Sequence, residues 1–141
     1  MRGFTLIEVI IAIGIFGILL SAAAPFTARV YRGFLVTSEA RTFVYVLRRA
    51  ETRAMSNIGG QAHGVSWQLP DFVLFRGGSY ASRDADFDET YDVDGSVAVS
   101  GAFDVVFAAG SGLPSATGTW VFSDAVTSSS VVLNAVGAVT W

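Results

Sequence analysis

Hydrophobic residues fill the first fifth of the chain almost without a break. Residues 9–28 form a run of twenty positions with no formal charge. The apolar stretch extends back to Phe4, interrupted only by Thr5 and Glu8. A helix rises about 1.5 Å per residue, so such a run reaches roughly 30 Å, the thickness of the hydrocarbon core of a bilayer. The pattern therefore predicts a transmembrane helix over residues 4–28.

Apolar positions continue after this run, but only at intervals of four and three residues. This spacing places them on one face of a helix: Val36, Ala40, Phe43, Leu47, Ala50 and Ala54. We predict a single helix from about Phe4 to about Ser56, ended by Gly59-Gly60. Its first half is apolar all round, and its second half, 29–57, is amphipathic.

The rest of the chain alternates short β-rich runs with glycine, proline and aspartate turn signals. The expected strands are Ala62–Leu69, Phe72–Arg76, Ser96–Ser100, Phe103–Ala108, Thr119–Ser123, Ser130–Asn134 and Ala138–Trp141. Such short, closely spaced strands favour an antiparallel sheet with the helical stripe packed on one face. The predicted fold class is α+β: a long N-terminal helix, first transmembrane and then amphipathic, on a small antiparallel β-sheet head over 58–141.

Charge divides the chain into two parts of opposite sign. Residues 1–57 carry seven arginines and three acids, net +4, whereas 58–141 carry two arginines and nine acids, net −7. The chain has no cysteine, which excludes disulfides and cysteine-based metal sites. With a single histidine, His63, no usual zinc site or histidine-based triad forms. We therefore expect no catalysis, cofactor or metal, and interpret His63 as a surface or strand-edge residue.

The acidic segment Asp84–Asp94 begins like a calcium loop but departs from it. The sixth position is Glu89 instead of glycine, and the twelfth is Gly95 instead of glutamate, so the segment is not an EF-hand. Two readings stay open: an irregular calcium site that includes Asp92 and Asp94, and a solvated acidic loop.

Direct nucleic-acid binding by the head is not expected, because phosphate recognition requires a basic surface. Exposed aromatic rings could stack on bases, but those of the head alternate along strands, which is typical of a core. These aromatic residues are Trp67, Phe72, Phe75, Phe103, Phe107, Trp120 and Phe122.

Glu8 is the one charge within the apolar segment. A carboxylate in a membrane span costs about 2.5–3.5 kcal/mol on insertion scales, so a retained acid indicates a positive partner. A cut after Gly3 would create an α-amine on Phe4, one helical turn from Glu8. That amine would equally meet the Glu8 of a neighbouring chain, neutralising both charges and fixing the register between helices.

The run Gly3-Phe4-Thr5-Leu6-Ile7-Glu8 before the apolar stretch resembles the cleavage and methylation motif of type IV pilins and type II secretion pseudopilins. The resemblance implies cleavage after Gly3, N-methylation of Phe4, and docking of incoming subunits guided by Glu8. Gly17 and Pro25 match family positions that flank a helix stretch which melts in assembled pili. Proline also removes one helical hydrogen bond, so a kink at Pro25 is expected.

The same resemblance implies a domain order, partners and a location. The segments are a prepilin leader over 1–3, a transmembrane and assembly helix over 4–28, its amphipathic continuation over 29–57 and a β-rich head over 58–141. The implied partners are a prepilin peptidase and methyltransferase, other pilin or pseudopilin subunits, the inner-membrane assembly platform with its ATPase, and membrane lipid. The chain would span the cytoplasmic membrane once with its head outside, and then enter a filament at the cell surface or in the periplasm.

The leader Met1-Arg2-Gly3 is shorter than those usual in the family. A genuine short leader and a start codon farther upstream are both open.

The C-terminal segment Ser128–Trp141 resembles the closing hairpin of H-type minor pseudopilins and their pilus-associated relatives. Its turn is Asn134-Ala135-Val136-Gly137. The helix over residues 40–54 resembles the one that precedes their sheet. The absence of cysteine departs from major pilins that close a C-terminal loop with a disulfide, and so disfavours a major pilin of that type. Other major pilins stay open, beside the minor subunit that the resemblance of the head favours.

Other functions remain in competition with a filament subunit. The N-terminal run could be a secretory signal peptide cut after Ala22-Ala23-Ala24, or an unprocessed signal anchor. The whole chain could be a membrane-tethered binding module that never polymerises, with or without calcium in its head, or a minor pilin for DNA uptake.

Overall fold

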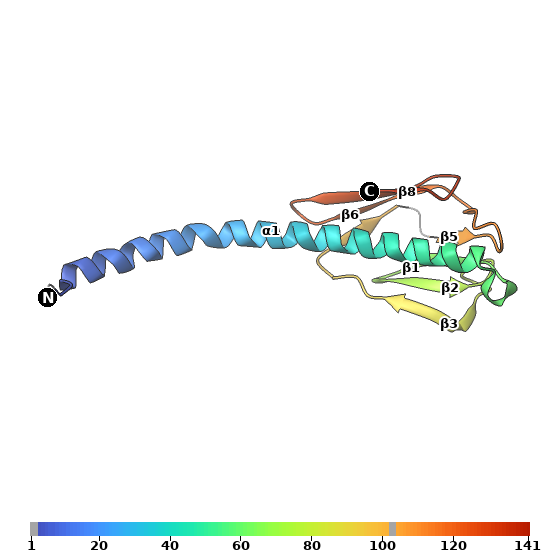
Figure 1. The fold of residues 1–141 in the computed structure, drawn as a ribbon, viewed down its shortest axis with the longest axis horizontal. Helices are drawn as coiled ribbons and strands as arrows, with labels where there is room; N and C mark the ends of the chain where they lie inside the picture. The colour runs from blue at the N-terminus through green and yellow to red at the C-terminus, as the bar shows by residue number, and fades with distance from the viewer. Residues whose placement is uncertain (1–2, 102–103) are drawn as a thin grey trace.

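The computed structural model describes residues 3–101 and 104–141, with the backbone alone over 22–29. A single long helix, α1 (Leu6–Met55), leads into a short 3-10 turn, η1 (Ile58–Gly60), and then into strands (Figure 1). The strands are β1 (His63–Gln68), β2 (Asp71–Arg76), β3 (Asp84–Tyr91), β4 (Ala98–Ser100), β5 (Asp104–Phe107), β6 (Gly118–Ser123), β7 (Ser128–Leu133) and β8 (Val139–Thr140). The predicted α+β class is confirmed.

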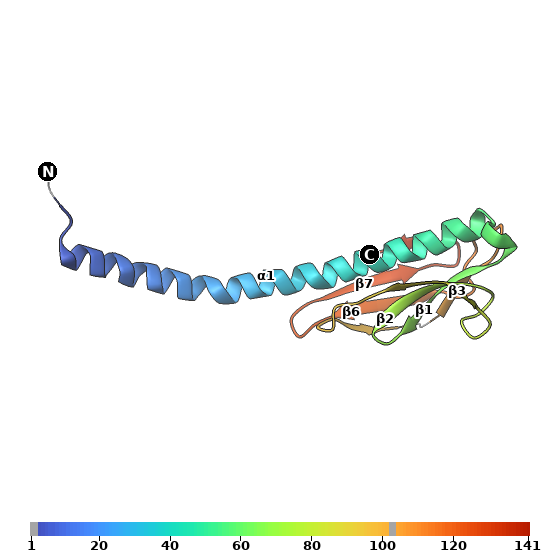
Figure 2. The ribbon, with the colours of Figure 1, turned by 90° about the horizontal axis from the view of Figure 1, so that it is seen from below.

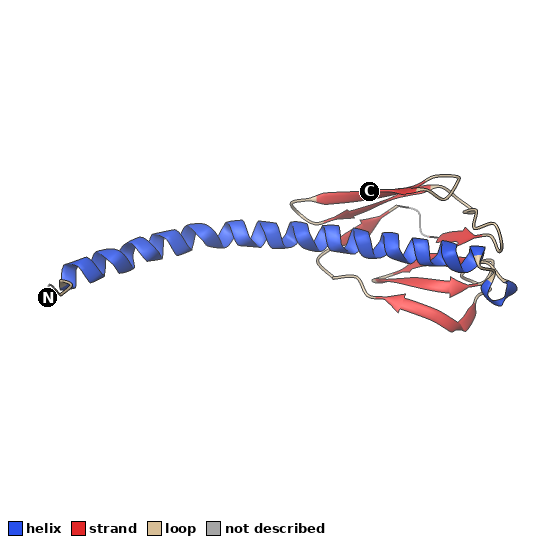
Figure 3. Ribbon diagram, in the orientation of Figure 1, coloured by secondary structure: helices blue, strands red, loops and turns tan. Residues whose placement is uncertain are grey.

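The strands form two antiparallel sheets instead of the single sheet predicted. One sheet has the order β3-β2-β1-β5 and the other the order β4-β6-β7-β8. Both lie along the C-terminal half of α1, while the N-terminal half extends away from them (Figure 3). Seen at right angles, the strands lie on one side of α1, and the helix curves along its length (Figure 2).

The predicted helical stripe is the centre of the core. All six of its residues are buried, and Val46 joins them. Phe43 contacts rings from both sheets: its centroid lies 4.5 Å from Phe72 of β2, and 4.9 and 5.6 Å from Trp120 and Phe122 of β6. The helix is therefore the layer that joins the two sheets.

The helix ends slightly earlier than predicted. Its last residue is Met55, and Ser56 caps it. Asn57 takes the left-handed conformation, with φ of 51°, ahead of the predicted stop at Gly59-Gly60. Asparagine tolerates this conformation better than most residues, so it can end a helix as glycine does.

All seven predicted strands are present, although the start predicted at Phe103 lies outside the described residues. The strand that sequence reasoning missed is β3, which was expected to be an acidic loop. Its acids are compensated by arginines: Asp84 pairs with Arg76, and Asp88 pairs with Arg83. An edge strand of this kind carries charged side chains without burying them. Its sequence therefore lacks the alternation of apolar and polar residues by which a strand is predicted.

The closing hairpin has the turn that the sequence predicts. Asn134 accepts hydrogen bonds on its side-chain oxygen from the amides of Val136 and Ala138, at 3.0 and 2.8 Å. Gly137 has φ of 86°, which favours glycine. The turn joins β7 to β8.

We expect Phe43→Ala to lower the free energy of unfolding by about 3–5 kcal/mol, because it opens a cavity between the helix and both sheets. The measurement is denaturant unfolding of the full chain in detergent, followed by tryptophan fluorescence, since every tryptophan lies in the head. Phe34→Ala is the matched control: this ring is 66% exposed, and its loss should change stability by less than about 0.5 kcal/mol. Equal effects from both variants would contradict the bridging role of Phe43.

Candidate functional site

The N-terminal part of α1 carries large apolar side chains that are exposed among the described residues. The exposed residues are Phe4, Leu6, Ile7, Val9, Ile10, Ile11, Ile13, Ile15, Phe16, Ile18, Leu19 and Leu20, with Phe4 at 84%. Apolar exposure on this scale marks a surface that meets lipid or another protein. Around Gly14 and Gly17, no atom lies within 4 Å of where a Cβ would stand, so neither glycine is needed for packing inside this chain.

Glu8 begins the helix together with Thr5. The Thr5 hydroxyl accepts a hydrogen bond from the Glu8 amide at 3.4 Å, and the Glu8 carboxylate accepts one from the Thr5 amide at 3.5 Å. This reciprocal arrangement is a capping box, and Thr5-Leu6-Ile7-Glu8 has its sequence signature. This second role of Glu8 is not among those predicted above, although a threonine three residues before a glutamate is a signal for it.

The other residues of the predicted processing site lie beside this cap. Gly3 and Phe4 are exposed and precede the first helical turn, so the bond between them is accessible. Met1 and Arg2 of the predicted leader lie outside the described residues. The geometry brings the Glu8 carboxylate next to the backbone at which a new terminus on Phe4 would arise.

The predicted kink and membrane span concern the middle of the helix. The backbone of α1 is helical through Gly17 and Pro25, while the side chain of Pro25 lies outside the described residues. The predicted span over 4–28 includes side chains that are likewise not described. Among the helices of the described residues, none has both the length and the hydropathy of a membrane span. Local melting at Gly17 and Pro25 stays a prediction.

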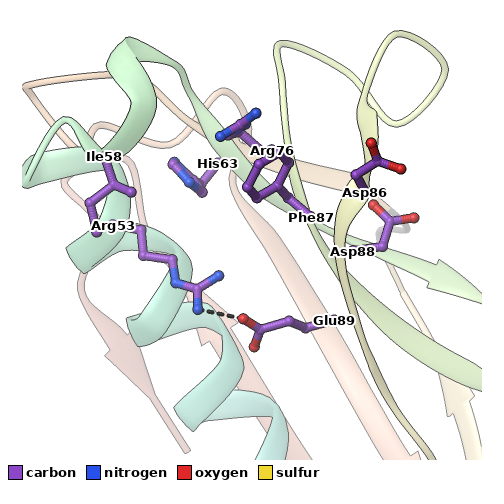
Figure 4. A pocket seen from close by; sticks show the side chains of 8 residues that line it. All are labelled: Arg53, Ile58, His63, Arg76, Asp86, Phe87, Asp88 and Glu89. Carbon is purple, nitrogen blue, oxygen red and sulfur yellow. Dashed lines mark hydrogen bonds and ion pairs between the residues drawn. The ribbon is translucent and has the colours of Figure 1, made fainter.

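A second feature is a pocket of about 370 Å³ at the end of the head where α1 finishes. Figure 4 shows Arg53, His63 and Arg76 facing Phe87 and Glu89 across it. The other lining residues are Ile58, Asp86 and Asp88. Asp86 and Asp88 extend from the opposite side of β3 to Phe87 and Glu89, as alternate residues of a strand do (Figure 4).

His63 is buried in this pocket, and its prediction as a surface or strand-edge residue is wrong. It is 3% exposed and opens β1, which lies between β2 and β5. Its Nδ1 has no hydrogen-bond partner among the described residues, and neither does the buried Nε of Arg76. A buried polar atom left without a partner costs about 1–3 kcal/mol. The pocket therefore has unused hydrogen-bonding capacity.

Three influences act on the pKa of His63. Burial lowers this pKa below its usual value, and the nearby carbonyl of Gln61 opposes the shift. The positive charges of Arg53 and Arg76 lower it further. The imidazole is consequently neutral at pH 7.

Glu89 fastens β3 to the helix. Its carboxylate pairs with Arg53 and, at 2.9 Å, with Arg49, and it accepts a hydrogen bond from the Tyr91 hydroxyl at 3.1 Å. Burial alone would raise the pKa of Glu89, but the hydrogen bonds from Arg53 and Tyr91 and the charges of Arg53 and Arg49 hold it below its usual value. The edge strand is thus attached to α1 through a charged group.

The acidic residues around β3 do not converge on one point. Asp84 and Asp88 pair with arginines, and Asp94 accepts hydrogen bonds from the backbone and side chain of Ser96. Within the described part of the chain, no group of three or more acidic or histidine side chains is arranged to hold a metal ion.

Comparison with known proteins identifies one segment. Residues 1–24 match the model of the prokaryotic N-terminal methylation motif. No curated protein and no solved structure matches the chain. The motif supports a type IV pilin-like or pseudopilin subunit that is processed by a prepilin peptidase and assembles with other pilins.

We expect Glu89→Gln to reduce the free energy of unfolding at pH 7 by about 1–2 kcal/mol, a modest loss because solvent screens these partly exposed pairs. The folded-state pKa of Glu89 is lowered, so its contribution is complete above the usual value of 4.5 and is lost as pH falls below it. The variant should therefore lose less stability than the unmodified chain between pH 6 and pH 3. Urea midpoints across this range measure the difference.

Glu39→Gln is the matched control for this pH dependence. Burial raises the pKa of Glu39, the backbone amide of Asp94 opposes the shift, and the charge of Asp94 adds to it. Neutralising Glu39 should consequently cause no loss at pH 7. If the stability difference between Glu89→Gln and the unmodified chain did not change with pH, Glu89 would not attach β3 to the helix as a charged group.

Proposed function

We propose that this chain is a structural subunit, and a minor one, of a type IV pilus or a type II secretion pseudopilus. It is cut after Gly3, methylated on the amine of Phe4 and assembled through α1. Its role is mechanical and not enzymatic. One observation carries the proposal: the methylation motif over 1–24 lies on a helix end whose large apolar side chains are exposed in the described part of the chain.

The pairing of Glu8 with the amine of a neighbour gives this helix a register. Each processed copy would contribute one carboxylate and one ammonium, and both are costly in an apolar medium unless paired. The capping box supports this role, because it already holds the carboxylate beside the backbone that becomes the new terminus.

Glycine inside a helix supports close approach of a second helix. Gly14 and Gly17 each weaken an isolated helix by about 1 kcal/mol relative to alanine. Both glycines face open space among the described residues, so no packing contact there offsets the loss of helix stability that they cause. Small residues at such positions let neighbouring helix backbones approach closely in an assembly. We also propose that the stretch of α1 between Gly17 and Pro25 melts in the filament.

Before assembly, the segment 4–28 would lie in the cytoplasmic membrane with the head outside. The uncharged run of residues 9–28 supports this location. Exchange of lipid contacts for helix contacts has little apolar driving force, so filament growth requires the assembly platform and its ATPase. The filament would then lie in the periplasm or at the cell surface.

Two features of the head support the proposal that this is a minor subunit related to the H-type pseudopilins. Its last two strands form the closing hairpin with a turn at Asn134–Gly137, as this resemblance implies. The helix over residues 40–54 precedes the sheets in the same order.

The first test is the mass of the mature N-terminus, measured on protein purified from cells that carry the assembly machinery. We expect a chain that starts at methylated Phe4. Gly3→Val should leave the precursor uncut, while Gly33→Val, the same substitution within α1, should be processed normally, since a side chain at Gly33 would meet no other part of the described residues. A start at Pro25 would indicate a signal peptide, and an intact Met1 would contradict the proposal.

The second test separates the charge of Glu8 from its capping role. Glutamine also completes a capping box, so Glu8→Gln removes the charge while it keeps the cap. We expect this variant, and Glu8→Leu, to insert in membranes but to form no filaments by electron microscopy.

Thr5→Ala provides the opposite change. It removes the cap at a cost of about 1 kcal/mol and leaves the Glu8 charge intact. We expect filaments to persist. If Glu8→Gln formed normal filaments, or if only Thr5→Ala lost them, the role of Glu8 in assembly would be capping of the helix and not charge pairing.

A further inference from the structure

The turn between β6 and β7 is the part of the head that reaches furthest toward the N-terminal end of α1 (Figure 1 and Figure 2). Its shape is fixed by Asp124, whose carboxylate accepts hydrogen bonds from the amides of Val126 and Thr127, both at 2.7 Å. The amide of Asp124 also donates to the carbonyl of Thr127 at 3.0 Å. The turn is therefore held rigidly, and Val126 within it is 56% exposed.

The turn lies beside Arg32 of α1. The amides of Val126 and Thr127 hold the pKa of Asp124 below its usual value, burial opposes this shift, and the positive charge of Arg32 lowers the pKa further. A charge changes a pKa in this way only from nearby. Arg32 also precedes the buried Val36 by one helical turn, so it lies on the side of α1 that faces the head. Arg32 thus marks the position along the helix at which the turn lies.

This position is close to the end of the proposed membrane segment. The uncharged run ends at Ala28, and Arg32 follows it by four residues, a rise of about 6 Å in a helix. The headgroup region on each side of a bilayer is about 5–8 Å thick. With residues 9–28 in the hydrocarbon core, Arg32 and the turn consequently lie at the depth of the lipid headgroups.

The helix has the composition of an interfacial segment at this depth. Tyr31 and Phe34 are 61% and 66% exposed, and the side chain of Arg32 is exposed as well. Tyrosine is enriched where a chain crosses the headgroup region, because its ring has an apolar body and a polar tip. An arginine near the end of a span extends toward the lipid phosphates. These side chains support the depth assigned to the turn.

The acidic connection between β3 and β4 is held farther from the lipid. It contains Asp92 and Asp94, whose charges would repel lipid phosphates. The amide of Asp94 donates to the carboxylate of Glu39 at 3.4 Å, so this connection lies beside Glu39. Glu39 follows Ala28 by 11 residues, a rise of about 16 Å, which exceeds the thickness of the headgroup region. The connection therefore stays in water, whereas the turn between β6 and β7 reaches the lipid.

We propose that the turn over residues 124–127 binds the phospholipid headgroup region of the membrane before assembly, with Val126 inserted as an apolar anchor. The contact rests on the membrane location proposed above and adds to it a second attachment, separate from the span. Asp124 does not oppose the contact, because two amides and Arg32 compensate its charge. The helix and the turn together would fix the tilt of the head on the membrane until the subunit enters a filament.

The absence of native cysteine allows single reporters on the full chain in phospholipid nanodiscs. A fluorescent label is attached to Val126→Cys, and its quenching by lipids with a nitroxide on the headgroup is measured. Gly95→Cys is one control, since it lies in the connection beside Glu39 and no atom lies within 4 Å of where its Cβ would stand. Leu113→Cys, 52% exposed in the loop that contacts Met55, is the other. We expect quenching at residue 126 to be at least about twice that at either control, because only this site lies at headgroup depth.

A fourth reporter, Phe16→Cys, separates failure of this inference from failure of the proposed function. A nitroxide within the acyl chains should quench it, because residue 16 is at the middle of the proposed span. Without that quenching the chain would not span the membrane, and the inference would fall with the proposed function. Quenching at residue 16 but not at residue 126 would overturn this inference alone. Equal quenching at residues 126, 95 and 113 would mean that the whole head lies on the membrane, which would also overturn it.

A second comparison separates binding from proximity. The label is moved to Ala125→Cys, and Val126 beside it is changed. Val126→Asp places a negative charge among lipid phosphates and should reduce the headgroup quenching at least about twofold. Val126→Leu keeps an apolar side chain and should retain the quenching. Equal quenching in these two variants would mean that the helix merely holds the turn near the lipid, which overturns the proposal.

Discussion

The fold depends on the burial of one helical stripe against two sheets that lie on the same side of α1. Buried residues of both sheets form one cluster with the residues of α1 between Val36 and Ala54, and Phe43 contacts aromatic rings of both sheets. A buried aliphatic or aromatic side chain contributes about 1.5–3 kcal/mol, so this stripe is the main source of stability available to the head. Because the stripe begins near Val36, the large apolar residues before it are exposed among the described residues. The division between a packed head and an unpartnered helix follows from where the stripe starts.

Continuity of α1 links these two parts. The helix is one element from Leu6 to Met55, so in this unassembled state the direction of its first half fixes that of the head. Its last turns are held by charged groups and not only by packing. Glu89 attaches β3 to two arginines of the helix, and Arg48 donates to the carbonyl of Gly137 at 3.4 Å in the closing turn. The head is therefore attached rigidly to the second half of α1, without a hinge at the end of the helix.

The sequence predicted the helix, its buried stripe and seven strands, because each shows a clear period or turn signal. It did not predict β3, whose acids are compensated by arginines both near in sequence, as Arg83 with Asp88, and distant, as Arg53 with Glu89. Those pairs exist only after folding, and no local pattern encodes them. The burial of His63 was missed for a related reason: a polar residue reads as exposed unless its neighbours are known. The pairing of strands into two sheets likewise depends on contacts far apart in sequence. The capping box, in contrast, was visible in the sequence.

The two roles of Glu8 limit what its charge can contribute to assembly. In the unprocessed chain its carboxylate serves its own helix through Thr5. After a cut at Gly3, the amine of Phe4 would lie near the Glu8 of the same chain as well as that of a neighbour. Pairing within one chain would already neutralise both charges. Pairing between chains therefore adds only the difference in free energy between the two kinds of ion pair. The net attraction must then come from helix packing around Gly14 and Gly17, in a medium where apolar surface alone gives no preference. Glu8 would select the register of subunits, and close packing would supply their affinity.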